Sequence, residues 1–161
     1  MKQLIYSLII ILTLTNNTFS AGTSSDSSSG SSNYTKAYNL IKAAKKYEKK
    51  GKTEKAQKRY TKAQKLLLIS NKEKPLQANT LNYLGFTTRK LGDYEKGEAF
   101  YLQGLKIDPD HKGINEYLGE LYVVTKRLDK AKERLEVLKN CNCEEYNDLK
   151  EIIDGTKKSK Y

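Results

Sequence analysis

The side chains that could perform chemistry in this chain are few, namely Cys141, Cys143 and a single histidine, His111. A positioned histidine is the most common general base, and a cysteine becomes a strong nucleophile when a base activates it. Neither cysteine has a histidine at a predictable place, and His111 follows Pro109-Asp110 in a predicted turn. A general base and a solvated turn residue are both open interpretations of His111, and the turn favours the second.

The same residues do not predict a metal or cofactor site. A structural zinc site needs four ligands, which two cysteines and one histidine do not complete, and the glycines do not form a phosphate-binding loop. We therefore expect no cofactor, no metal and no enzymatic activity. Cys141 and Cys143 could instead form a disulfide, because two residues of one extended segment lie within the ~4.4–6.8 Å Cα separation that the bond needs.

The first 20 residues predict export. Lys2 precedes an apolar run from Leu4 to Leu14, and Thr18 and Ser20 are small residues suited to cleavage after Ser20, the layout of a signal peptide. The run is shorter than the roughly 20 apolar residues of a membrane span, although an uncleaved anchor that faces the periplasm remains the alternative. Residues 21–33 predict a flexible linker rich in Ser and Gly, residues 34–155 a folded domain, and residues 156–161 a basic tail.

An internal repeat organises the rest of the chain. The residues NYLG at 82–85 return as EYLG at 116–119, 34 positions later, and this period is typical of stacked helix-turn-helix units. We predict repeats at about 37–70, 78–111 and 112–139, followed by a capping helix at 144–154. Repeat one begins 41 residues before repeat two, and the excess is assigned to a loop at 70–75, with Pro75 opening the next helix.

These repeats resemble the tetratricopeptide repeat (TPR) family. The resemblance is carried by Leu81, Leu84-Gly85, Tyr101 and Pro109 in repeat two, and by Leu118-Gly119, Tyr122 and Ala131 in repeat three. It implies an all-α fold, a right-handed α-solenoid of about three repeats plus a C-terminal capping helix. Residues 81–149 also resemble small exported bacterial TPR proteins, in which a cysteine pair precedes Glu-Glu-Tyr, and this implies a periplasmic location.

In this family the first helix of each repeat lines a concave groove that binds a partner peptide or helix. The corresponding residues here are Tyr38, Ile41, Lys45, Asn79, Asn82, Phe86, Arg89, Glu116, Glu120 and Val123. Phe86 is the favoured contact, with packing against the neighbouring repeat as its alternative. Some members grip a terminal carboxylate at positions that correspond to Ile41, Lys45, Tyr83, Gly113 and Tyr117, and only Lys45 is basic, which disfavours that mode.

The net charge of +11 is concentrated in repeat one, because residues 36–74 hold 14 Lys or Arg and 3 Asp or Glu. One interpretation is a patch that attaches the protein to an anionic membrane or polymer, and the other is a solvated, lysine-rich helix face. The composition disfavours nucleic acid as the partner, since only four of the 30 basic residues are arginine. The patch comprises Lys42, Lys45, Lys46, Lys49, Lys55, Lys58, Arg59, Lys62 and Lys65.

The leading hypothesis is a non-enzymatic scaffold of the bacterial periplasm or cell envelope that binds a protein partner in its groove. The alternative is a peripheral module that attaches to an anionic membrane or polymer through the basic first repeat.

Overall fold

The computed structural model describes residues 32–159. The predicted signal peptide, residues 21–31 of the predicted linker, and residues 160–161 of the predicted tail lie outside this part of the chain. The described residues form helices and turns, without a strand. The helices are α1 (Asn33–Lys49), α2 (Thr53–Glu73), α3 (Ala78–Lys90), α4 (Tyr94–Ile107), α5 (Lys112–Val124), α6 (Leu128–Leu138) and α7 (Glu144–Ile153).

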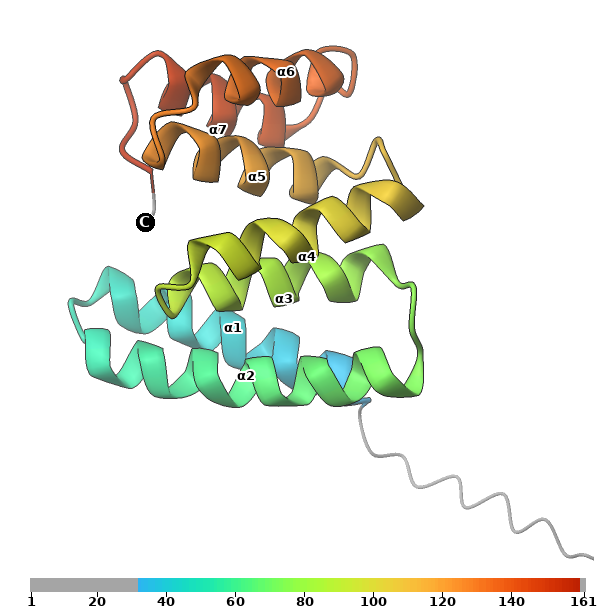
Figure 1. The fold of residues 1–161 in the computed structure, drawn as a ribbon. Helices are drawn as coiled ribbons and strands as arrows, with labels where there is room; N and C mark the ends of the chain where they lie inside the picture. The colour runs from blue at the N-terminus through green and yellow to red at the C-terminus, as the bar shows by residue number, and fades with distance from the viewer. Residues whose placement is uncertain (1–31, 160–161) are drawn as a thin grey trace, which may run out of the picture.

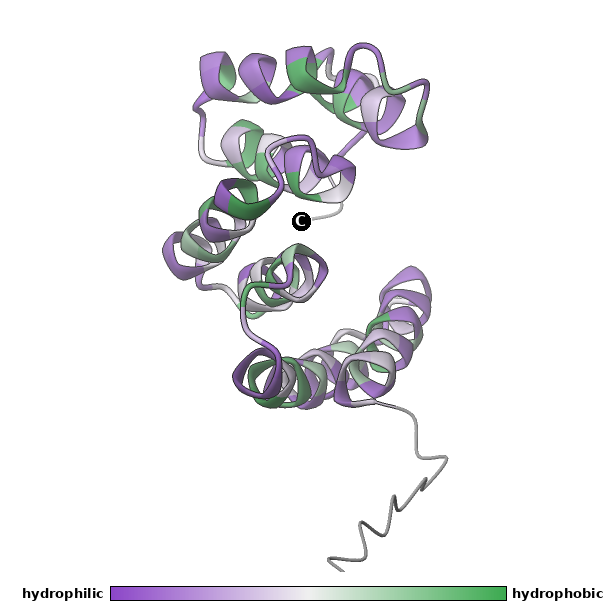
Figure 2. Cartoon of the chain, turned by 90° about the vertical axis from the view of Figure 1, so that its right-hand side faces the viewer, coloured by the Kyte–Doolittle hydropathy of each residue, from purple (hydrophilic) through white to green (hydrophobic). Residues whose placement is uncertain are grey.

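The helices stack in antiparallel pairs, α1 with α2, α3 with α4 and α5 with α6, and α7 covers the last pair (Figure 1). Seen from the side, the stack of helices is curved (Figure 2). The first helices of successive pairs, α1, α3 and α5, contact one another. The fold is therefore the predicted all-α array of helix-turn-helix repeats with a capping helix.

The turn residues between α3 and α4 determine where α3 ends and α4 begins. Gly92 has a φ of 97°, a left-handed conformation that glycine adopts without steric cost, so α3 ends and the chain reverses. The carboxylate of Asp93 then accepts a hydrogen bond from the backbone N–H of Lys96 at 3.0 Å and caps α4. The corresponding turn before α6 uses Lys126, with a φ of 62°, in place of a glycine.

Two elements of repeat one differ from the sequence expectation. Helix α1 begins at Asn33, inside the predicted linker, because the Ser32 hydroxyl accepts a hydrogen bond from the Thr35 N–H and caps the helix. Helix α2 continues to Glu73 through most of the predicted loop, and the Asn33 amide donates to the Glu73 carboxylate at 3.0 Å. Pro75 lies before the α3 N-cap and does not open that helix, so the extra length of repeat one is mainly helical.

Glycines let neighbouring helices pack closely at two places. A Cβ on Gly85 of α3 would lie 2.5 Å from the ring of Tyr101 of α4, so the ring occupies the space that a side chain would need. In the third pair, a Cβ on Gly119 would lie 2.5 Å from Leu149 of α7. Leu149 of the capping helix α7 therefore packs against Gly119 of α5 in the way that Tyr101 of α4 packs against Gly85 of α3.

Candidate functional site

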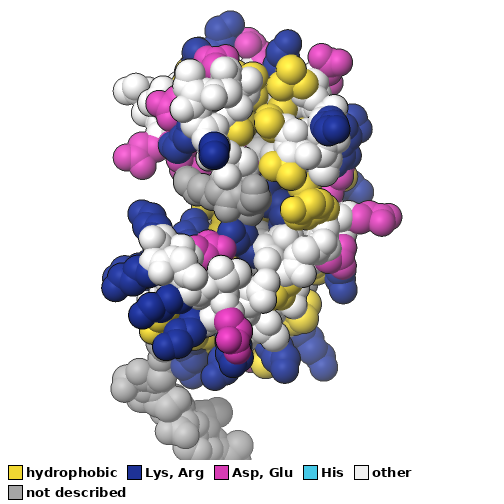
Figure 3. Space-filling model, turned by 90° about the vertical axis from the view of Figure 1, so that its left-hand side faces the viewer, with side chains coloured by type: hydrophobic (Ala, Val, Ile, Leu, Met, Phe, Trp, Pro, Cys, Tyr) yellow, Lys and Arg dark blue, Asp and Glu magenta, His cyan; other side chains and the backbone are white. Residues whose placement is uncertain are grey.

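A pocket opens on the concave face between α1 and α3. Its volume is ≈ 600 Å³, and it is lined by Lys42, Lys45, Lys46, Glu48, Lys49, Thr53, Phe86 and Lys90. Five lysines and one glutamate therefore surround a single aromatic ring. Figure 3 shows Lys and Arg side chains gathered over the half of the molecule that α1 and α2 form.

Phe86 forms the floor of this pocket. The side chain is only 2% exposed, and its ring lies 5.8 Å from that of Tyr60 in an edge-on arrangement and 5.1 Å from that of Tyr117. The Lys45 ammonium lies 4.5 Å above the Phe86 ring and donates to the Tyr117 hydroxyl at 3.1 Å. Both interpretations of Phe86 thus describe part of its position, because it packs between repeats and also presents a ring face to the pocket.

The acidic residue of the pocket is already engaged. Glu48 accepts a hydrogen bond from the Tyr60 hydroxyl at 2.8 Å and forms an ion pair with Lys90 at 2.6 Å. Burial and this carboxylate both raise the pKa of Tyr60, so its hydroxyl keeps its proton. Sequence analysis missed Lys90, although it directly follows Arg89 at the end of α3. Only the packing of α3 against α1 brings it to the pocket.

A second hollow continues the concave face toward α5. Its volume is ≈ 500 Å³. Tyr117 connects the two hollows, since its ring lines the second while its hydroxyl binds Lys45. The lining residues are Asn79, Asn82, Tyr83, Asp108, Asp110, His111, Lys112, Gly113, Glu116, Tyr117 and Glu145. Four of them are acidic, so the groove is basic at its α1 end and acidic at its α5 end.

The ten predicted groove residues divide into three groups. The residues that line the hollows are Lys45, Asn79, Asn82, Phe86 and Glu116. Tyr38 is exposed and Val123 partly exposed, but neither lines a hollow. Ile41, Arg89 and Glu120 were predicted as groove contacts, but they are core residues that line neither hollow. The reason is that first helices also pack against one another, and this contact covers one side of each.

Arg89 and Glu120 form a buried ion pair between α3 and α5. Their side chains are 1% and 0% exposed, and one guanidinium nitrogen of Arg89 lies 3.2 Å from the Glu120 carboxylate. Another Arg89 nitrogen donates to the Tyr117 carbonyl at 2.6 Å. The segment after α7 returns to the same place, because the Ser159 hydroxyl lies 3.4 Å from the Glu120 carboxylate. The predicted end of the folded domain at Gly155 is therefore too early.

The predicted basic patch is divided between two faces of repeat one. Lys42, Lys45, Lys46 and Lys49 line the concave pocket. On α2, the side chains of Lys55, Lys58, Lys62 and Lys65 are exposed and lie outside the hollow lining. Arg59 is partly buried, with its guanidinium carbon 4.3 Å above the Tyr47 ring. These nine residues are not a single surface, because α1 and α2 point their polar sides in different directions.

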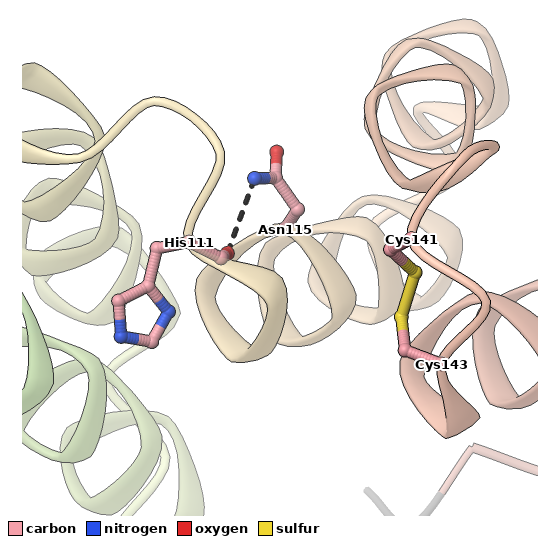
Figure 4. The surroundings of a disulfide bond; sticks show 4 residues. All are labelled: His111, Asn115, Cys141 and Cys143. Atoms are coloured by element: carbon pink, nitrogen blue, oxygen red, sulfur yellow. Dashed lines mark hydrogen bonds between the residues drawn. A yellow bond between two sulfur atoms is a disulfide. The ribbon is translucent and has the colours of Figure 1, made fainter.

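His111 is the N-cap of α5. Its Nδ1 accepts a hydrogen bond from the Ile114 N–H at 3.1 Å, so Nε2 carries the proton of the neutral ring and donates to the Asn79 carbonyl oxygen at 3.0 Å. Its own carbonyl accepts from the side-chain amide of the buried Asn115 (Figure 4). His111 is thus a partly buried structural cap, which differs from both a general base and a solvated spacer.

We expect the cap to make stability depend on pH. Burial lowers the pKa of His111 below its ordinary value of 6.5, although Asp108 and Glu145 oppose that shift. The unfolded chain therefore binds the proton more tightly, and the cap's contribution is complete above pH 6.5 and is lost as the pH falls through the folded pKa. Protonated Nδ1 cannot accept the Ile114 N–H, so the loss should be about 1 kcal/mol.

Urea unfolding at about pH 7.5 and about pH 5 tests this expectation. The matched variant is His111→Asn, because an asparagine side chain keeps a capping oxygen and does not titrate. The variant should lose less stability than the parent chain between the two pH values. Equal losses in the two proteins would contradict the role of His111.

The structure joins Cys141 and Cys143 in a disulfide between α6 and α7, with their Cα atoms 5.2 Å apart (Figure 4). Asn142 between them has a φ of 45°.

Because the closed loop is so small, we expect the variant with Cys141→Ser and Cys143→Ser to lose at most about 2 kcal/mol of unfolding free energy. Urea unfolding measures this loss, and alkylation without reductant should leave both thiols unlabelled in the parent chain. A variant that fails to fold would contradict the small effect.

Residues 32–159 lack two features. Within this range, no group of three or more His, Cys, Asp or Glu side chains is placed to hold a metal ion. None of its helices combines the length and apolar character that crossing a membrane requires.

Comparison with known proteins identifies the repeat. Residues 78–111 match the model of the tetratricopeptide repeat family. Among solved structures, the Yersinia enterocolitica type III secretion translocator chaperone SycD superimposes with a TM-score of 0.53 at 17% identity, covering 73% of this chain and 81% of that one. The first TPR domain of human RPAP3 gives a TM-score of 0.48 at 21% identity, with 78% and 98% covered.

A third structure is the first TPR of Spaghetti (RPAP3) bound to the HSP90 peptide SRMEEVD, with a TM-score of 0.49, 21% identity, and 76% and 94% of the two chains covered. A comparison with curated proteins gave no match. Residues 78–111 are a tetratricopeptide repeat, and the described part of the chain has the all-α fold of tetratricopeptide repeat proteins.

Proposed function

We propose that this protein is a non-enzymatic interaction module that binds a partner peptide or helix along its concave face. The observation that carries the proposal is the groove itself, in which two hollows of ≈ 600 Å³ and ≈ 500 Å³ adjoin across Tyr117. Aromatic rings, amides and charged groups line it, a mixture that suits an extended polypeptide. SycD, which shares the fold, is named as a translocator chaperone, and this supports a protein as the partner.

We further propose that the protein acts in the periplasm or cell envelope of a bacterium. The support is the signal-like sequence of residues 1–20 and the resemblance of residues 81–149 to small exported proteins. The disulfide between Cys141 and Cys143 is compatible with an oxidising compartment.

A pull-down from envelope extract tests the proposal. Mature protein from Ala21 should retain a discrete protein at low and high salt, which mass spectrometry identifies. Substituting Tyr38→Ala together with Asn79→Ala on the concave face should release it. The matched control is Tyr94→Ala with Gln103→Ala on α4, because Tyr38 and Tyr94 are 37% and 39% exposed and both pairs remove one ring and one exposed amide. Equal retention by the two variants would contradict binding in the groove.

The exposed lysines of α2 support a second candidate, attachment to an anionic membrane or polymer. Lys55, Lys58, Lys62 and Lys65 follow one another at helical spacing and are exposed. Sedimentation with anionic vesicles tests it, since attachment should disappear as ionic strength rises. The variant with Lys55→Gln, Lys58→Gln and Lys62→Gln should lose attachment. Retained attachment would rule out this face.

A further inference from the structure

We propose that the lysine pocket of the concave face binds the acidic end of a bipolar peptide and holds one of its apolar side chains against Phe86. This inference rests on the proposed function and specifies the chemistry of the partner.

Positive charge is concentrated along one side of the pocket. Lys42, Lys46 and Lys49 lie four and three residues apart, so they share one face of α1. None of the ion pairs formed within residues 32–159 includes them. Like charges at this spacing repel one another, and carboxylates of a ligand would relieve that repulsion.

The pocket's own acidic residue does not provide this relief. Glu48 is held by Lys90 at 2.6 Å and by the Tyr60 hydroxyl at 2.8 Å. The charge of Glu48 is therefore balanced by Lys90 of α3, and the rim that the α1 lysines form remains positive. The ligand that complements this rim carries negative charge.

The pocket also has an apolar floor, formed by Phe86. The Phe86 ring is fixed by Tyr60 and Tyr117, and the small part of it that lines the pocket, beside the Lys45 ammonium, is a rigid apolar surface in an otherwise charged pocket. Inorganic phosphate or a bare polyanion has no group that covers such a surface. A peptide that carries an aromatic or aliphatic side chain next to its carboxylates uses both the rim and the floor.

The groove changes from basic to acidic along its length. Beyond Tyr117 the second hollow is lined by Asp108, Asp110, Glu116 and Glu145. A uniformly acidic peptide would meet these carboxylates and be repelled. The ligand therefore has acidic residues at one end only, and its other end is neutral or basic.

This site differs from the terminal-carboxylate clamp known in the family. The clamp positions correspond to Ile41, Lys45, Tyr83, Gly113 and Tyr117, which contain one basic residue. The positive rim lies instead on the C-terminal half of α1, at Lys42, Lys46 and Lys49, so it addresses acidic side chains.

The experiment measures binding of the full mature chain to labelled peptides by fluorescence anisotropy. The probe is a short peptide with a glutamate-rich half, a central phenylalanine and a lysine-rich half. Substituting Lys42→Gln, Lys46→Gln and Lys49→Gln together should weaken binding about tenfold. The matched control, Lys55→Gln with Lys58→Gln and Lys62→Gln, removes the same charge from α2 and should leave the affinity unchanged. Replacing the probe's phenylalanine with alanine should also weaken binding.

Each other outcome overturns the inference. Equal losses from the two triple variants would show nonspecific charge attraction, and an equally tight all-glutamate peptide would contradict the bipolar groove. Displacement of the probe by inorganic phosphate or by phosphatidylglycerol vesicles at comparable affinity would identify a small anion or a lipid as the ligand. If the Lys42, Lys46 and Lys49 variant still retained its partner in the envelope pull-down, the proposed function would stand and this inference would fail.

Discussion

Replacing Arg89 with methionine should destabilise the protein by about 3–5 kcal/mol. The substitution leaves the Glu120 carboxylate in the interior without the guanidinium that lies 3.2 Å from it, and it removes the donor to the Tyr117 carbonyl at 2.6 Å. Both interactions join α3 to α5, so the loss should weaken the junction between the second and third repeats. Urea unfolding followed by circular dichroism measures the free energy of unfolding.

A double variant separates the charge effect from the loss of packing. The variant with Arg89→Met and Glu120→Leu removes both charges of the pair, and replacing both members of a buried pair with apolar residues is often close to neutral. We therefore expect the double variant to be more stable than Arg89→Met alone. A loss of less than about 1 kcal/mol in Arg89→Met would show that water reaches the pair in solution.

The second large effect is expected at Tyr101. Its side chain is 0% exposed and fills the space beside Gly85 of the neighbouring helix. Tyr101→Ala should therefore destabilise the protein by about 3–5 kcal/mol, because it leaves a cavity between α3 and α4. Urea unfolding measures this loss. The substitution removes no contact with a partner in the groove, because Tyr101 lines neither hollow.

The control for this variant is Tyr101→Phe, for which we also predict the effect on stability. Within the described residues, the Tyr101 hydroxyl is buried and has no hydrogen-bond partner. An unsatisfied buried hydroxyl is unfavourable, so Tyr101→Phe should leave stability unchanged or raise it slightly. A marked loss in Tyr101→Phe would show that the hydroxyl has a partner, such as a buried water.

The groove and the core were difficult to separate from sequence because they use the same helices. In α3, Phe86 and Arg89 lie three residues apart and were both predicted to face a partner. Phe86 does line the pocket, whereas Arg89 turns to Glu120 of α5. The helical period places residues on a face of a helix, but the crossing of neighbouring helices decides how much of that face is covered.

Local chemistry could be read directly from the sequence. The 34-residue period, the turn at Gly92, the cap at Asp93 and the packing role of Tyr101 depend on residues that are close along the chain, so the pattern determined the all-α repeat fold. The length of α2 was misjudged because Ser70–Glu73 is polar and resembles a loop. A contact from Asn33, 40 residues earlier in the chain, ties its end in place.

Only the tertiary structure decided how charge is distributed. Sequence alone assigned nine basic residues of repeat one to a single patch, but the structure divides them between the concave pocket and the outer face of α2. In the structure Lys90 also lines the pocket, where its ammonium balances the charge of the Glu48 carboxylate. The physical reason is that charges act through space, so their partners depend on which helices pack together, whereas helix formation and turns depend mainly on neighbours in the chain.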